Sequence, residues 1–141
     1  MSHRETIERY YRGCNTADEA LMQACFTEDV VHYFVDHAAV HGREGLARYW
    51  ARVGPRTQAE WHVDHCMELG DEAVIEWSMR WLPPDNAATG TFERLRGTEW
   101  FRFRDGLISE VRSYHCNHRL AAPENRALHD FPYAERGYPE E

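Results

Sequence analysis

The sequence contains no lysine: all 16 of its basic residues are arginine. A Schiff-base enzyme, a pyridoxal-phosphate enzyme and a P-loop nucleotide-binding protein are thereby excluded, since each depends on a lysine amine. The formal net charge of −8 argues against a general binder of nucleic acid or of anionic membranes, because contact with phosphates needs a positive patch. No apolar run approaches the roughly 20 residues that span a bilayer. Residues 1–5 do not resemble a signal peptide, so we expect a cytoplasmic protein.

Paired cysteines are also missing. The four cysteines, Cys14, Cys25, Cys66 and Cys116, are far apart and form no CxxC motif. A structural zinc site normally shows such paired spacing. In a chain without a secretion signal we therefore expect free thiols in a reducing cytoplasm.

The order of the predicted elements indicates an α+β fold. Helical spacing of apolar residues predicts three helices, over residues 2–15, over a short stretch around 21–26, and over residues 42–53. A strand at 30–35 lies between the second and the third helix. Strands at 59–69 and 73–82 form one hairpin, and strands at 90–104 and 107–118 form another around Asp105-Gly106. This pattern predicts helices on one face of an antiparallel sheet.

A chain of 141 residues fits one domain with a real core and a small pocket. We place this domain at residues 1–120 and an extended C-terminal tail at residues 121–141. The tail carries Phe131, Tyr133 and Tyr138, which suggests that it packs on the mouth of a pocket or on a partner subunit. The alternative is a disordered end.

The predicted register of the first hairpin brings a histidine into an apolar surface. With a three-residue loop at 70–72, His65 lies opposite Trp77, and Trp61 lies opposite Trp81. The odd-numbered positions of both strands are then apolar except His65, and a one-residue slip would mix the two faces. Such surroundings lower the pKa of an imidazole toward the neutral form, which suits general acid/base chemistry. The alternative is a core histidine with one backbone hydrogen bond.

The second hairpin places a carboxylate on the apolar side of the sheet. A three-residue turn at 104–106 puts Phe103 opposite Leu107 and Glu99 opposite Val111. Burial of a carboxylate without a partner costs several kcal/mol. We therefore expect Glu99 to be protonated, paired or functional. Its alternative role is to pair with a buried arginine or hydroxyl.

Five stretches of the sequence resemble one family in composition and in order: residues 7–10 (Ile-Glu-Arg-Tyr), 15–18 (Asn-Thr-Ala-Asp), 24–30 (Ala-Cys-Phe-Thr-Glu-Asp-Val), 42–53 and 98–108. They are similar to the SnoaL-like branch of the nuclear transport factor 2-like superfamily, which includes ketosteroid isomerases, polyketide cyclases, scytalone dehydratase and limonene epoxide hydrolase. The resemblance covers about residues 4–118. It implies a cone-shaped α+β barrel, in which a strongly curved sheet wraps three helices around an apolar pocket. It also implies a homodimer formed through the open sheet face.

Transfer of the family's site residues gives an altered site. Tyr10 matches the oxyanion-hole tyrosine of ketosteroid isomerases, and Glu99 takes the place of their second oxyanion-hole acid. Their catalytic aspartate corresponds to Phe34, so that base is missing. In SnoaL-like cyclases the catalytic histidine falls at Glu99 and the catalytic aspartate at Ser113. Because both are changed, the resemblance does not carry either mechanism onto this chain.

We predict a cofactor-free enzyme that performs acid/base chemistry on a small apolar or aromatic molecule, of the isomerase, dehydratase or cyclase type. In this hypothesis His65 is the base or acid, Tyr10 and Glu99 polarise an oxygen, and Asp36 orients a histidine. The alternative for Asp36 is a strand end beside a solvent loop, and that for Tyr10 is an aromatic core residue. The expected substrate-binding residues and pocket walls are His32, Phe34, Trp61, Trp77, Trp81, Phe101, Phe103, Ser113, His115 and Asn117.

The residues leave two further hypotheses open. His32, His65 and His115, together with Glu99 or Asp36, would point into one cavity and would suit zinc or iron, although no HExxH motif is present. The other hypothesis is a non-catalytic binding module of the same fold. An open cavity on which the predicted catalytic residues converge would favour the enzyme. Tryptophan and phenylalanine side chains that fill the cone would favour the binding module.

Overall fold

The structure, a computed structural model, describes residues 1–115 and 127–139. The helices are α1 (His3–Thr16), α2 (Glu19–Gln23) and α3 (Arg43–Thr57). The strands are β1 (Phe26–Tyr33), β2 (Val40–His41), β3 (Glu60–Leu69), β4 (Glu72–Trp81), β5 (Glu93–Arg104) and β6 (Leu107–His115). A short 3-10 helix, η1 (Pro84–Asn86), connects β4 to β5.

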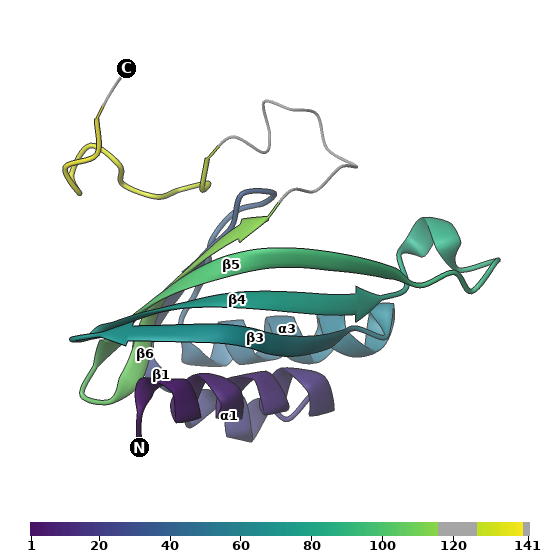
Figure 1. Cartoon of the computed structure of the whole chain (residues 1–141), viewed down its shortest axis with the longest axis horizontal. Helices are drawn as coiled ribbons and strands as arrows, with labels where there is room; N and C mark the ends of the chain where they lie inside the picture. Colours follow the sequence, from purple (N-terminus) through teal and green to yellow (C-terminus); the bar gives the residue numbers. More distant parts are fainter. Residues whose placement is uncertain (116–126, 140–141) are drawn as a thin grey trace.

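The six strands form one mixed sheet in the order β2-β1-β6-β5-β4-β3. β1 and β6 run parallel, and every other neighbouring pair is antiparallel. The sheet curves over the helices, which cover one of its faces (Figure 1). The predicted α+β fold, with three helices packed on a curved and mostly antiparallel sheet, is confirmed. In the described parts of the chain, no helix is long and apolar enough to cross a membrane.

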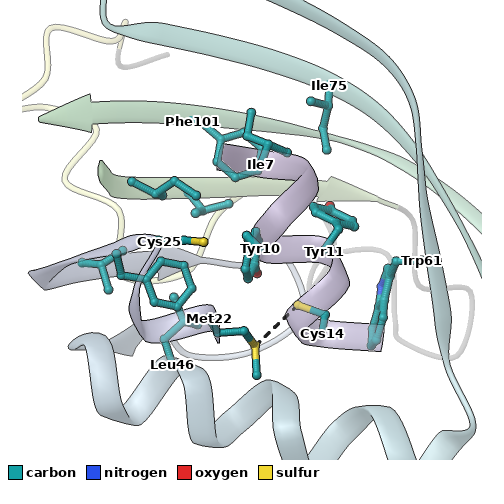
Figure 2. Packing of buried hydrophobic residues seen from close by; sticks show 14 of the residues in the cluster. Ile7, Tyr10, Tyr11, Cys14, Met22, Cys25, Leu46, Trp61, Ile75 and Phe101 are labelled. Carbon is teal, nitrogen blue, oxygen red and sulfur yellow. Dashed lines mark hydrogen bonds between the residues drawn. The ribbon is translucent and has the colours of Figure 1, made fainter. Parts of the chain in front are cut away.

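The inner face of the sheet packs on α1. A capping box fixes the start of this helix, because Ser2 Oγ accepts a hydrogen bond from the Glu5 N–H and the Glu5 carboxylate accepts one from the Ser2 N–H. Figure 2 shows Tyr10 and Tyr11 side by side on α1, between the helix and the sheet. The buried apolar stripe of α1 consists of Ile7, Tyr10, Tyr11 and Cys14. Its removal from water, at about 25 cal/mol per Å², is the main force that holds the helix on the sheet.

The predicted register of the first hairpin is wrong. The turn contains only residues 70–71, and a bulge interrupts the pairing between Val63 and His65. Val63 therefore pairs with Trp77, whereas His65 pairs with Glu76. Because a bulge adds one residue to one strand, the side chains beyond it change faces. His65 thus lies on the outer face of the sheet.

The second hairpin also has a turn of two residues, 105–106, and an irregularity in the register between Arg102 and Phe103. Both turn residues have positive φ, as a tight hairpin turn requires. Glu99 consequently pairs with Ser113 and not with Val111. The partner of Glu99 is thus two residues further along β6 than predicted. Because side chains on a strand return to the same face every two residues, Glu99 stays on the inner face, as predicted.

The described part of the C-terminal segment, residues 127–139, packs against the ends of β1 and β6. Leu128 and Phe131 are buried in a small cluster with Val35, the second residue after β1. The Arg136 guanidinium donates two hydrogen bonds, of 2.8 and 3.1 Å, to the Glu110 carboxylate of β6. The expected domain boundary near residue 120 lies outside the described residues.

Candidate functional site

Glu99 is a carboxyl group buried on the inner face of β5, with 5% of the residue's surface exposed. The Tyr11 hydroxyl of α1 donates a hydrogen bond to Glu99 Oε1. Burial raises the pKa of Glu99 from the ordinary 4.5 to about 7, and this effect outweighs the lowering caused by the Tyr11 hydrogen bond. The carboxyl group therefore gains and loses its proton near neutral pH, as a general acid or base must.

His32 of β1 is fully buried beside this carboxyl group. Its Nε2 lies 2.6 Å from Ser113 Oγ and 3.6 Å from Glu99 Oε2. Burial lowers the pKa of His32 well below its ordinary range, and the nearby His37 and His115 add to this lowering. The imidazole is therefore neutral at pH 7. It supplies no positive charge to stabilise an ionised Glu99, which agrees with the raised pKa of that residue.

A small cavity lies beside Glu99, and it is lined by Tyr10, Tyr11, Cys14, Trp50, Trp61 and Glu99. Its volume of about 10 Å³ is the space that one water molecule needs. Two polar atoms of the lining residues, Trp50 Nε1 and Glu99 Oε2, are buried without a hydrogen-bond partner among the described residues. The interior of the cone is thus largely filled by aromatic side chains, and it keeps one small polar gap.

An aromatic layer adjoins the cavity on the side of the β1–β2 connection. The Phe34 ring stacks on His32 with 4.1 Å between centroids, and its centroid lies 5.9 Å from that of Trp50. The His37 ring lies 4.0 Å from Phe34, and His37 Nε2 is hydrogen-bonded to the Tyr49 hydroxyl at 2.8 Å. Since Phe34 is buried and His37 is partly exposed, a ligand that comes from this side must displace the layer.

The connection between β1 and β2 also carries a carboxylate–histidine pair. Asp36 Oδ2 lies 3.3 Å from His115 Nε2 at the end of β6, so the predicted contact of Asp36 with a histidine is made to His115. The C-terminal segment holds the same connection. One of its backbone N–H groups donates to the Phe34 carbonyl at 2.8 Å, and the Asp130 carboxylate accepts from the Ala39 N–H at 2.9 Å.

The inward position predicted for His65 is wrong. The His65 side chain is 80% exposed on the outer face and lies 3.8 Å from Glu76. The bulge between residues 63 and 65 is the physical reason, because it turns Val63 inward and His65 outward. The structure therefore does not bring His65 together with Glu99.

Of the two neighbouring tyrosines of α1, Tyr10 packs in the aromatic core and Tyr11 makes the polar contact at the site. Tyr10 is packed edge-on against Phe26 and Phe101, with centroids 5.1 and 6.4 Å away. It is Tyr11 that donates to Glu99. Sequence reasoning missed Tyr11 because both tyrosines belong to the same apolar stripe of the helix.

Most of the predicted pocket walls belong to the wider core. Trp61 lines the cavity. Phe103 lies at the other end of β5, where its ring stacks on His3 with 3.9 Å between centroids. Trp50 was not predicted as a site residue, although it falls on the apolar stripe of α3. Asn117 lies outside the described residues. The remaining walls belong to the main hydrophobic core or pack against it: Trp77, Trp81 and Phe101.

The structure does not assemble the three-histidine metal site. His65 is on the outer face, whereas His32 and His115 contact the inner polar groups. Within residues 1–115 and 127–139, no three His, Cys, Asp or Glu side chains are grouped so as to hold a metal ion. The metal-binding hypothesis for these histidines is therefore wrong in its geometry.

Comparison with known proteins identifies the family. The family model of the SnoaL-like domain matches residues 7–111. The chain belongs to this family. A solved structure of a protein of unknown function with a cystatin-like fold, from Methylobium petroleophilum PM1, is 32% identical with a TM-score of 0.80, and the match covers 99% of this chain and 91% of that one. The comparison with curated proteins gives no match.

Two more distant neighbours share the fold. TerC, co-crystallised with polyporic acid, is 17% identical with a TM-score of 0.70, and the match covers 81% of this chain and 91% of that one. A Pseudomonas putida KT2440 protein that carries the name of a polyketide cyclase is 23% identical with a TM-score of 0.67, and the match covers 84% of this chain and 94% of that one. The predicted membership of the SnoaL-like branch is confirmed.

Proposed function

We propose that the protein is a small-molecule enzyme that uses acid/base catalysis in an apolar pocket, of the isomerase, dehydratase or cyclase type. The observation that carries this proposal is Glu99, a buried carboxyl group whose pKa is raised to about 7 by burial beside an aromatic cavity. Such a group holds its proton for part of the time at neutral pH, and it therefore serves both as acid and as base.

Glu99 is the proton-transfer group in this proposal, and its two oxygens have different tasks. Oε1 accepts the hydrogen bond from Tyr11. Burial raises the pKa of Tyr11 well above its ordinary value, so the phenol stays protonated and remains a donor. Oε2 is left to exchange a proton with the substrate. The neutral His32, whose Nε2 lies 3.6 Å from Oε2 and 2.6 Å from Ser113 Oγ, limits the movement of the carboxyl group.

The chemistry balances with one proton. The ionised carboxylate takes a proton from a carbon next to a carbonyl group, and the electron pair of that C–H bond moves toward the carbonyl oxygen. The carboxylic acid then returns the proton. Return to another carbon gives an isomerisation, and return to a departing hydroxyl group gives a dehydration. Attack of the carbanion on a second carbonyl, followed by protonation of the new alkoxide, gives a cyclisation. The exclusion of water from the aromatic cavity supports each of these steps.

The neighbouring folds support a small organic ligand. TerC was co-crystallised with polyporic acid, and the aromatic lining of the cavity in this chain favours an apolar or aromatic molecule. The second candidate function is a non-catalytic binding module. The volume of the cavity, which fits one water molecule, favours this second candidate, because an acid/base enzyme needs its aromatic layer to open for the substrate.

Hydrogen–deuterium exchange next to a carbonyl separates the two candidates. The wild-type protein is incubated in D₂O with a set of small cyclic and aromatic ketones, and deuterium incorporation is measured by mass spectrometry. We expect incorporation into at least one ketone, reduced at least 100-fold in Glu99→Gln. Glu76→Gln is the matched control, because the Glu76 side chain is 63% exposed on the outer face. An absence of incorporation, or equal rates for the wild type and Glu99→Gln, would contradict acid/base catalysis by Glu99.

We also infer a homodimer formed through the outer face of the sheet. Met67, Leu69 and Trp100 are 71%, 86% and 40% exposed, which is unusual for such large apolar side chains on one surface. Acidic and arginine side chains are mixed on this face, so a second copy related by a twofold axis can pair opposite charges. Sedimentation equilibrium should give twice the monomer mass, and Met67→Glu should shift the protein toward monomer. A monomeric wild-type protein at micromolar concentration would contradict this inference.

A further inference from the structure

We propose that the outer face of the sheet carries a second binding site, which binds a phosphate monoester with an apolar body. Arg80, Arg94 and Arg96 bind the phosphate group, and a groove beside them takes the apolar body. The outer face is the one that the helices leave uncovered (Figure 1), so this site and Glu99 lie on opposite faces of the sheet. The proposal therefore goes beyond the catalysis proposed above and does not depend on it.

The pairing of β4 with β5 places the three arginines side by side. Arg80 of β4 lies directly opposite Arg94 of β5, and Arg96 is exposed on the same face two residues further along β5. In an antiparallel pair, the Cβ atoms of opposite residues are about 5 Å apart and those of diagonal neighbours are about 7–8 Å apart. Three flexible guanidinium groups at this spacing reach one tetrahedral anion, whose oxygens accept several of their N–H groups.

None of these three guanidinium groups forms an ion pair with a carboxylate in residues 1–115 and 127–139. The arginines that do form such pairs in these ranges are Arg4, Arg102, Arg104, Arg112 and Arg136. Like charges directly opposite each other destabilise a sheet, and Arg80 and Arg94 form such a pair in a chain whose net charge is −8. An anion bound between them removes this repulsion.

The Arg80 guanidinium is held in place without the use of its N–H groups. Its Cζ atom lies 3.6 Å from the centroid of the Phe92 ring, just before β5. This cation–π stack uses the flat face of the guanidinium, so the N–H groups at its edge stay available to an anion. The long side chain is therefore ordered before the ligand binds, which favours affinity.

Two carboxylates of β3 lie near the arginines. Glu60 is the strand partner of Arg80 on its other side. Asp64 accepts a hydrogen bond from His62 at 2.9 Å, and this bond is the main cause of its lowered pKa, to which the charge of Arg96 also contributes. The three arginines exceed these two carboxylates by one positive charge, so the surface attracts an anion.

A groove on the same face begins at Arg96 and crosses the sheet from β3 to β6. Its volume is about 510 Å³, which is within the range of small-molecule sites. The side chains of Met67, Val74 and Tyr114 line it, and they favour the burial of an apolar body. Glu76 also lines the groove, and it repels a second anionic group. The ligand therefore carries its negative charge at the arginine end only.

The arginines lie apart from the apolar side chains of the inferred dimer interface. Trp100 is four residues beyond Arg96, about 13 Å along β5. Leu69 is at the same end of the sheet as Trp100, because it pairs with the first residue of β4, whereas Arg80 is next to the last residue of that strand. A second copy that covers the apolar end therefore leaves the phosphate-binding end open.

Calorimetric titration of the full chain at low salt tests the two parts of the ligand separately. The probe is 2-naphthyl phosphate, with 2-naphthol as the match that lacks the phosphate and inorganic phosphate as the match that lacks the apolar body. We expect the probe to bind about tenfold more tightly than either, or better. Equal binding of 2-naphthol would contradict the arginine site, and equal binding of inorganic phosphate would contradict the groove. No binding of the probe at millimolar concentration would overturn both.

The variant Arg94→Gln tests the phosphate-binding end. We expect it to weaken the binding of 2-naphthyl phosphate by about tenfold or more, because hydrogen bonds between charged groups are strong. Arg48→Gln is the matched control, since Arg48 is exposed on α3 and its loss changes the net charge equally. Equal affinities of the two variants would show a general attraction of the anion to the protein and would overturn the site.

Sedimentation equilibrium distinguishes a small ligand from a second copy of the chain as the occupant of the arginines. We expect Arg94→Gln to have the same mass in solution as the wild type, because the arginine end lies outside the inferred dimer interface. A shift of this variant toward monomer would show that carboxylates of a second copy occupy the arginines, and the ligand site would be wrong.

Discussion

Gly97 of β5 lies against the indole ring of its strand partner, Trp77 of β4. A Cβ atom at position 97 would be 2.5 Å from Trp77 Cζ2 and 2.8 Å from the Tyr114 carbonyl oxygen. The missing side chain lets the Trp77 ring lie over the strand, where it meets the His115 ring edge-on with 6.0 Å between centroids. A glycine within a strand commonly marks such a close approach. Gly97 therefore makes room for the aromatic inner face beside Glu99.

Substitution of Gly97 by alanine should destabilise the fold. Because the new Cβ would collide with a ring and with backbone, we expect Gly97→Ala to lower the free energy of unfolding by about 2 kcal/mol. Gly45→Ala is the matched control, since a Cβ there meets no atom within 4 Å and alanine favours the α3 helix by up to about 1 kcal/mol. Urea denaturation followed by tryptophan fluorescence measures both. Equal stability of the two variants would contradict the proposed contact.

The two adjacent tyrosines of α1 should differ in their effect on Glu99. The Tyr11 hydrogen bond lowers the pKa of Glu99 against the larger effect of burial. Tyr11→Phe should therefore raise the pKa of Glu99 above about 7, and Tyr10→Phe should leave it unchanged. The measurement is a ¹³C NMR titration of the Glu99 carboxyl carbon. A larger shift in Tyr10→Phe than in Tyr11→Phe would reverse the assignment.

Glu99 should make the folded protein less stable as the pH rises. Its pKa is about 7 in the folded state against an ordinary 4.5, so between these values the folded state keeps a proton that the unfolded state has lost. Stability from this residue is complete below pH 4.5 and is lost as the pH rises to about 7, with a total of about 3 kcal/mol. His32 acts in the opposite direction, because its lowered pKa costs stability as the pH falls below its ordinary 6.5.

The variant Glu99→Gln isolates the contribution of the carboxyl group. The free energy of unfolding of the wild type minus that of Glu99→Gln should fall by about 3 kcal/mol between pH 4.5 and pH 7.5, since the His32 contribution cancels in the difference. Glu76→Gln should show no such trend. A difference that is constant with pH would mean that Glu99 is ionised throughout this range in the folded protein.

The sequence predicts the faces of β5 correctly but fails on β3, and the reason is local. Alternation of apolar and polar residues places Glu99 inward. The two-residue turn shifts the predicted pairing by one position and the irregularity between Arg102 and Phe103 shifts it by a second, so Glu99 keeps its face. On β3 the bulge between Val63 and His65 adds a single residue and reverses every later side chain. The alternation around His65 contains no signal for this bulge. Tyr11 and Trp50 were missed because helical spacing shows which stripe is buried and not which of its members meets a partner on a distant strand.

The exposed position of His65 gives a direct test of this correction. His65→Ala should leave the rate of deuterium exchange within about twofold of the wild type, because a solvated side chain on the outer face does not reach the cavity. The stability of the monomer should also change little, since surface substitutions usually alter the free energy of unfolding by less than about 0.5 kcal/mol. A 100-fold loss of exchange with intact folding would show that His65 does reach the substrate.

The C-terminal segment should control how often the aromatic layer opens. The Asp130 carboxylate accepts the hydrogen bond from the Ala39 N–H at 2.9 Å, and a backbone N–H of the segment donates to the Phe34 carbonyl at 2.8 Å. Asp130 has φ of +63°, which glycine adopts without strain. Asp130→Gly therefore removes the carboxylate without forcing a new backbone conformation.

Hydrogen exchange at the Ala39 amide measures this opening. We expect at least a tenfold faster exchange in Asp130→Gly, because loss of a hydrogen bond to a charged group costs about 1.5 kcal/mol or more. Asp130→Asn is the matched control, since asparagine tolerates positive φ and keeps an acceptor oxygen, and its exchange should stay near that of the wild type. If both variants exchange at the wild-type rate, the C-terminal segment does not hold the β1–β2 connection. Access to the cavity would then depend on the contacts of Phe34 and His37 with α3 alone.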